Sequence, residues 1–338
     1  MAWKALKRLG LLLLGVWVAF WLFRLPGFTP PTATAIGSAI GSLDGLSDED
    51  RRAFSPEGFV PLGKPRPGDW LSVFPEPGQG FDRYRAARPN RLAAPRTVIA
   101  LLPLWEFDAG RSPSLPALQA FTAAFFQAGV RLLPAQAPPP GEFHPRRNPQ
   151  SGQIQFLTTD LLAFLKPQVG TDVHSLVGVT MQDLYPDPSW NFVFGEATLS
   201  DRVGIFSFAR YAPGFSGNPG RTGWQDLLLR RSCKVLAHET GHMFGLLHCV
   251  FFECVMNGSN HLGESDARPM FLCPVCLRKL QHAAGFDIRA RYVALAGFYK
   301  QVGFTSEADW IDRRLAFIAG TASPTAWPSP APPPASSP

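Results

Sequence analysis

The stretch HETGHMFGLLHC at residues 238–249 decides the fold, because it gathers three histidines, a glutamate and two glycines within twelve residues. On a helix, His238 and His242 lie four residues apart and share one face, one turn above the other. Two imidazoles in this arrangement can bind the same metal ion. Glu239 lies beside them and can take a proton from a metal-bound water without being a ligand. The stretch therefore predicts a catalytic metal site on a helix.

A third metal ligand must come from beyond this helix, because a continuing helix would turn His248 away from the other two histidines. Gly245 can adopt left-handed dihedrals without penalty, so the helix can end there and the chain can return to the metal. Three neutral histidines and one open position are typical of a catalytic zinc. The alternative third ligand is a later carboxylate, Glu264 or Asp266. It would leave Gly245 and His248 of the extended HExxHxxGxxH pattern unexplained.

All five cysteines lie in one part of the chain, and four of them form two close pairs. The spacing Cys249-x4-Cys254 followed by Cys273-x2-Cys276 predicts a closed tetrahedral zinc site. Two disulfides are the alternative, and an exported protein would favour them. Cys233 is predicted to be a buried spare on the apolar face of the motif helix. We therefore expect two zinc ions per chain, one catalytic and one structural.

Short apolar runs and helical patterns alternate upstream of the motif. The last two predicted strands are joined by only four residues, which predicts an antiparallel hairpin. The order of elements favours an α/β fold with a twisted mixed five-stranded sheet, an antiparallel edge strand and an active-site helix. The predicted strands are 97–102, 130–133, 176–181, 192–198 and 203–209, and the predicted helices are 115–127, 159–166 and 225–244.

The ends of the chain differ from its middle. Within residues 1–28, three basic side chains precede an uninterrupted apolar run, 9–23. This pattern favours a single uncleaved membrane anchor, with the rest of the chain on the extracytoplasmic side, over a cleaved signal and a secreted protein. Residues 29–94 are rich in proline and glycine, which predicts a linker and lead-in to a catalytic domain at 95–320. The Pro-rich tail, 321–338, is predicted to be disordered.

The composition is that of a packed globular protein, with 46% apolar and 17% charged residues. The formal net charge of +6 is mild, and no run of Lys or Arg alternates with aromatic residues. Binding to nucleic acid is therefore not expected. The expected partners are a peptide or protein substrate and, through the N-terminal segment, a membrane. We expect the protein to be a monomer.

The motif resembles that of the archaemetzincins, a branch of the metzincin zinc peptidases, and looks most like the eukaryotic type. The resemblance rests on HETGHMFGLLHC-x4-C-x-M, with CPVC following after sixteen residues. It extends to 176–211, 227–239 and 256–281, with a weaker match at 68–84.

The resemblance implies a metzincin-like zincin domain with its catalytic zinc on His238, His242 and His248. Glu239 would be the general base and acid, and Met256 would form the Met-turn beneath the metal. The structural zinc would be held by Cys249, Cys254, Cys273 and Cys276. A peptide would dock along the edge strand at 192–198.

The sequence as a whole predicts a zinc metallopeptidase, and the resemblance hints at aminopeptidase-like action on short peptides. The alternative is a non-catalytic zinc protein that binds peptides or acts as a scaffold at the membrane. Glu239 argues against this alternative, because a pure binding site has no chemical need for a base beside the metal. His261 could contact substrate near the metal, although a lone polar loop residue is more often structural.

Overall fold

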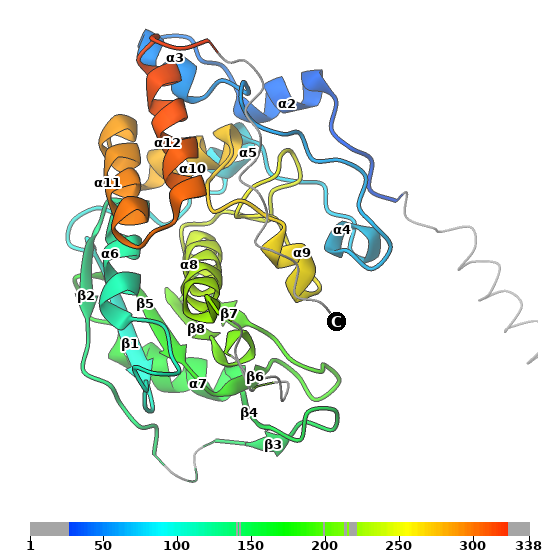
Figure 1. Cartoon of the computed structure of the whole chain (residues 1–338), viewed down its shortest axis with the longest axis vertical. Helices are drawn as coiled ribbons and strands as arrows, with labels where there is room; N and C mark the ends of the chain where they lie inside the picture. The colour runs from blue at the N-terminus through cyan, green and yellow to red at the C-terminus, as the bar shows by residue number, and fades with distance from the viewer. Residues whose placement is uncertain are drawn as a thin grey trace, which may run out of the picture.

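The computed structural model in Figure 1 describes residues 27–323 except 140, 142, 199, 213–214 and 216–221. At its centre is a five-stranded sheet in the order β2-β1-β5-β8-β7. The first four strands in this order are parallel to one another, and β7 lies antiparallel to β8 at the edge. The predicted α/β fold with its antiparallel edge strand is thus confirmed. The strands are β1 (Val98–Leu104), β2 (Gly129–Leu132), β5 (Val173–Thr180), β7 (Gly195–Ala197) and β8 (Val203–Ser207).

The central strands β1, β5 and β8 are buried along nearly their whole length, which explains their continuous apolar sequence. Successive side chains of a strand point to opposite faces, so Ile99 packs in one hydrophobic core and Ala100 in the other. The first core includes side chains of α6 (Leu115–Phe126) and α8 (Trp224–Met243), and the second those of α7 (Thr158–Leu165). Figure 1 shows α8 between the sheet and the C-terminal helices.

A separate three-stranded sheet, in the order β3-β4-β6, was not predicted. Its strands have only two to four residues, which is too few to show a period-2 pattern. The side chain of Gln155 donates hydrogen bonds to Asp183 and to the carbonyl of Asn191, at 2.9 Å each. This sheet therefore supports the loop that precedes the edge strand β7. Its strands are β3 (Arg146–Arg147), β4 (Ile154–Leu157) and β6 (Asp183–Tyr185).

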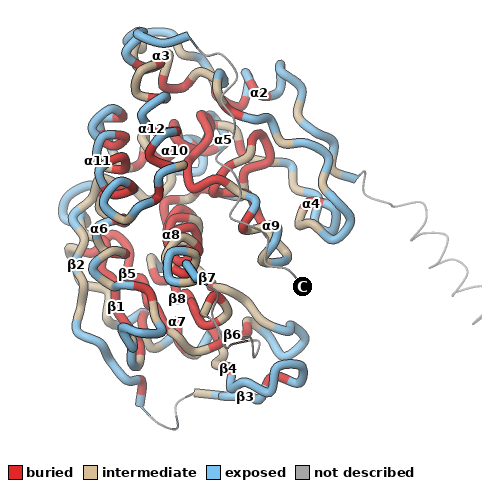
Figure 2. Tube along the Cα trace, viewed as in Figure 1, coloured by how far each residue is buried: buried red, intermediate tan, exposed pale blue. Residues whose placement is uncertain are grey.

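Residues 29–94, predicted to be a linker and lead-in, fold into four short helices that pack against the rest of the chain. Phe54, Phe81 and Tyr84 from this segment are buried in the main core. Figure 2 shows the buried segments where α5 meets α10. Helices of four to eight residues are too short to give a helical apolar pattern. The boundaries between domains stay a prediction.

The remaining helices come from the lead-in segment and from the part of the chain that follows the motif. Arg314, buried on α12, donates hydrogen bonds to the carbonyls of Ala53 and Glu57 and so ties α12 to the lead-in segment. The helices of the lead-in are α2 (Ala33–Ile40), α3 (Asp48–Ala53), α4 (Trp70–Val73) and α5 (Phe81–Ala86). The others are α9 (Leu262–Asp266), α10 (Pro274–Ala284), α11 (Ile288–Gln301) and α12 (Thr305–Ile318), with short 3-10 turns at Lys166–Gln168 and Ala209–Tyr211.

The predicted membrane-anchored localisation is wrong. Within the described residues, no helix combines the length and the apolar character needed to cross a membrane. Helix α8 reaches 20 residues, but it carries the charged side chains Arg230, Arg231 and Lys234, whereas a span needs about 20 predominantly apolar residues. The apolar run 9–23, on which the prediction rested, lies outside the described residues, as does the tail segment 324–338.

A buried ion pair fixes α8 to α9. Nε and Nη2 of Arg231 donate to the two carboxylate oxygens of Asp266, at 2.8 and 2.6 Å, and the two side chains are only 8% and 11% exposed. The ammonium of Lys234 donates to the carbonyl of Asp266 at 3.0 Å. The loop that follows the motif is thus held against the helix that carries it.

Replacing Asp266 by alanine is expected to lower the free energy of unfolding by about 3–5 kcal/mol, because it leaves the buried Arg231 charge without its partner. Denaturant unfolding would measure this change. Asp312→Ala is the matched control, since its pair with Lys300 is exposed and should contribute about 1 kcal/mol or less. Equal losses of unfolding free energy in the two variants would contradict a stabilising role for the buried pair of Arg231 and Asp266.

Candidate active site

Helix α8 presents His238, Glu239 and His242 toward a cleft and ends immediately after them, at Met243. Gly245 has a φ of +82°, and its N–H donates to the carbonyl of His242 at 2.8 Å. A Cβ on Gly245 would lie 2.9 Å from Cβ of Pro89, so both the dihedral and the space require glycine. The chain turns back at this point and brings His248 to the other two histidines.

The three imidazoles converge. Their ring centroids lie 4.7 Å apart for His238 and His242, 5.2 Å for His238 and His248, and 5.1 Å for the remaining pair. One nitrogen from each ring lies within 4.8 Å of the others. The geometry thus joins the three predicted ligands, and their role in binding metal stays a prediction.

The hydrogen bonds of these rings fit a metal ion. Nδ1 of His238 lies 2.8 Å from the carbonyl of Val255, and Nδ1 of His242 lies 2.6 Å from that of Leu246. A carbonyl only accepts, so each neutral ring carries its proton on Nδ1. The two Nε2 atoms then face each other at 3.1 Å with no proton between them, an arrangement that a shared cation would satisfy. Tetrahedral zinc with bonds of about 2.0–2.1 Å would place such nitrogens about 3.3 Å apart.

Burial sets the protonation of the site. It lowers the pKa of His242 to about 4 and that of His238 well below its usual value, so both rings are neutral, as metal ligands must be. Burial also raises the pKa of Glu239 to about 8, with a further contribution from the charge of Glu196. A dication beside Glu239 would counter both effects and favour its ionised form.

Met256 lies directly against the motif helix. Its side chain is fully buried, and a Cβ built on Gly241 would lie 2.7 Å from the Met256 sulfur. The N–H of Cys249 donates to the carbonyl of Met256 at 2.8 Å. The Met256 side chain thus packs against the turn of α8 that carries His238 and His242, and its role as a Met-turn stays a prediction.

The four paired cysteines form one cluster rather than two separate pairs. Their sulfurs lie within 4.8 Å of one another, and those of Cys249 and Cys273 are 3.5 Å apart. Tetrahedral zinc with Zn–S bonds of about 2.3 Å would place sulfurs about 3.8 Å apart. Among the described residues all five cysteines are free thiols, which argues against the disulfide alternative. Cys233 is fully buried and lies outside this group.

A cleft of about 680 Å³ opens over the histidines. One side is formed by the edge strand β7 with Glu196, and aromatic side chains supply much of the lining. An open, largely apolar cleft beside a strand edge can accept an extended peptide, since an edge strand offers unpaired backbone groups. The aromatic residues that line the cleft are Trp70, Trp190, Phe192, Phe194 and Tyr211.

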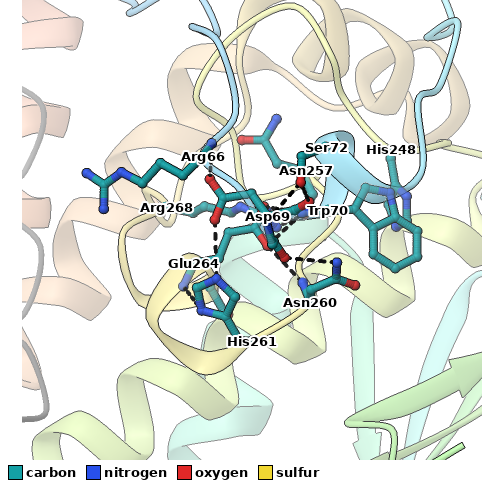
Figure 3. A network of polar contacts seen from close by, with 12 residues as sticks. Arg66, Asp69, Trp70, Ser72, His248, Asn257, Asn260, His261, Glu264 and Arg268 are labelled. Atoms are coloured by element: carbon teal, nitrogen blue, oxygen red, sulfur yellow. Dashed lines mark hydrogen bonds and ion pairs between the residues drawn. The ribbon is translucent and has the colours of Figure 1, made fainter. Parts of the chain in front are cut away.

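The two carboxylates considered as the third ligand are occupied elsewhere, and Figure 3 shows the contacts of Glu264. Glu264 accepts hydrogen bonds from the backbone N–H groups of Trp70 and Asn260, at 3.0 and 2.8 Å. Asp266 pairs with Arg231. His261 serves a structural role: its Nδ1 accepts from the N–H of Glu264 at 3.1 Å, and its Nε2 faces Asp69 at 3.2 Å.

The lead-in segment also contributes to this site, which its sequence does not predict. Trp70 lines the cleft, and the carboxylate of Glu76 lies 2.8 Å from Nδ1 of His248. Both residues fall in 68–84, the stretch that resembles the archaemetzincins only weakly. The weak resemblance of 68–84 is the feature of the sequence that could have placed this segment at the site.

The chain is similar to several known proteins. Residues 157–282 match the sequence profile of "Peptidase family M54". The chain is 40% identical to archaemetzincin-2 of Rattus norvegicus over 272 residues, 72% of this chain and 76% of that one. It is 33% identical to archaemetzincin-1 of Homo sapiens, over 67% of this chain and 51% of that one. The crystal structure of archaemetzincin from Methanopyrus kandleri has 30% identity and a TM-score of 0.44, covering 56% of this chain and 96% of that one.

Proposed function

We propose, because this chain belongs to the archaemetzincin family of zinc metallopeptidases, that it hydrolyses peptide bonds at the three-histidine site described above. In this proposal His238, His242 and His248 hold the catalytic zinc and Glu239 is the general base. The observation that carries it is the convergence of three imidazoles with Glu239 beside them at the base of an open cleft.

The proposed chemistry divides between the metal and the protein. Zinc, when bound, lowers the pKa of its water to about 7 and polarises the scissile carbonyl. Glu239 accepts the proton of the attacking water and then delivers it to the leaving amine. The backbone carbonyls of Val255 and Leu246 hold His238 and His242 in the tautomer that turns Nε2 toward the metal.

We further propose that a second zinc ion is bound by Cys249, Cys254, Cys273 and Cys276. Their burial closes the site to substrate, which suits a structural role. Met256, whose side chain packs against Gly241 of the motif helix, would form the Met-turn. The count of two zinc ions per chain can be measured directly by elemental analysis.

Aminopeptidase-like specificity is the finer part of this proposal. Glu196 lies on the edge strand and lines the cleft, and its carboxylate accepts a hydrogen bond from the Thr158 hydroxyl. Both carboxylates line the cleft, and the charge of Glu196 contributes to the raised pKa of Glu239. A carboxylate so placed could bind the free α-amino group of a peptide whose first bond lies at the metal.

The test is digestion of a mixed peptide library by the full-length, zinc-loaded chain, with the products identified by mass spectrometry. We expect single residues to be removed from N-termini, and N-acetylated copies of the same peptides to be spared because acetylation removes the charge. Internal cuts in both sets would retain the peptidase and reject the aminopeptidase specificity. No cleavage in either set would reject the proposed function.

A further inference from the structure

We propose that Glu76 is a positioning residue for His248, so that the lead-in segment completes the zinc site. Its carboxylate would hold the His248 ring with Nδ1 protonated and Nε2 directed at the metal. This inference rests on the proposed function, because it assumes that His248 binds zinc. It assigns a role to a segment whose sequence predicts a linker and lead-in.

The three histidines differ in how their outward nitrogens are held. Those of His238 and His242 face backbone carbonyls near the motif itself. That of His248 instead faces Oε1 of Glu76 at 2.8 Å, across 172 residues of sequence. A carboxylate is a stronger acceptor than a carbonyl, so it fixes the ring more firmly and raises the basicity of Nε2. Both side chains are largely buried, with exposed fractions of 20% and 26%.

Glu76 is itself held in place. The indole N–H of Trp70 donates to the same Oε1 atom at 2.6 Å, and the Trp70 ring meets the His248 ring edge-on at 5.1 Å. Pro75 and Pro77 flank the glutamate and restrict the backbone on both sides. The carboxylate is therefore oriented before any metal binds.

The segment that carries Glu76 is fastened to the loop and helix after the motif, as Figure 3 shows. Asp69 faces His261, and Glu264 accepts from the N–H of Trp70. A Cβ on Gly258 would lie 2.6 Å from the Trp70 indole, so only glycine allows the tryptophan to lie so close. These contacts explain how a segment so distant in sequence reaches the third histidine.

The test measures zinc affinity by competition with a chromophoric chelator, for the full-length chain and its variants. In His248→Ala, the competition step of the histidine site should be lost, which identifies that step in the other proteins. We expect Glu76→Leu to weaken this site by about 10–100-fold and to leave the cysteine site unchanged. Glu76→Gln should fall between, because its carbonyl oxygen can still accept both hydrogen bonds but carries no charge. Glu106→Leu, at an exposed glutamate, is the control.

Wild-type zinc affinity in a folded Glu76→Leu variant would overturn the proposal. If that variant does not fold, the isosteric Glu76→Gln decides: wild-type affinity at the histidine site overturns the proposal, and weakened affinity supports it. The result is independent of the test of function. A wild type that binds zinc but cleaves no peptide would reject only the peptidase activity, whereas an active wild type with unaltered affinity in the Glu76 variants would reject only this inference.

Discussion

Replacing Glu239 by glutamine is expected to lower kcat/KM for peptide hydrolysis by about 10²–10⁴-fold, the usual contribution of a general base. The amide has the shape of the carboxylate but cannot accept the proton of the attacking water. Glu239 does not belong to the cluster of three histidines that is proposed to bind the metal, so the zinc content should stay at the wild-type value. The measurement is steady-state kinetics on one peptide, with zinc determined on the same sample.

Glu106→Gln makes the same chemical change at an exposed position and should keep full activity. A Glu239→Gln enzyme that retains wild-type activity would exclude Glu239 as the base. A variant that loses both activity and zinc would instead show that the substitution damages the metal site, in which case the rate would say nothing about proton transfer.

Replacing Cys276 by serine is expected to remove one zinc ion per chain and most of the stability of the fold. The thiolates of a structural site release about 10–16 kcal/mol on binding zinc, which is comparable to the whole stability of about 5–15 kcal/mol of an ordinary domain. The cluster lies within the main hydrophobic core, where α10 meets the loop after the motif, so its loss would not remain local. Thermal unfolding and zinc analysis would measure both effects.

Cys233→Ala is the matched control, because Cys233 is as deeply buried but lies outside the cluster. It should keep the wild-type zinc content and lose only the stability that a small cavity costs, about 1 kcal/mol. A Cys276→Ser protein with undiminished zinc and an unchanged Tm would contradict a structural zinc at this cluster.

The core of the candidate site could be predicted because its residues are close in sequence. The helical period alone places His238 and His242 on one face, and Gly245 provides the turn that returns His248. The alternating apolar runs and helices predicted the central sheet, because parallel strands buried on both faces read as continuous apolar segments. The predicted membrane-anchored localisation was wrong, and it rested on a segment outside the described residues.

By itself, then, the sequence determined the ligand spacing, the paired cysteines and the antiparallel edge strand, because each depends on contacts within a few residues or on a repeating period. Only the tertiary structure decided that Glu76 faces His248, that Glu264 and His261 fasten the lead-in rather than serve the metal, and that 29–94 is packed. Such contacts join residues more than 150 positions apart. They have no local period, and they form only when burial of the shared core brings distant segments together.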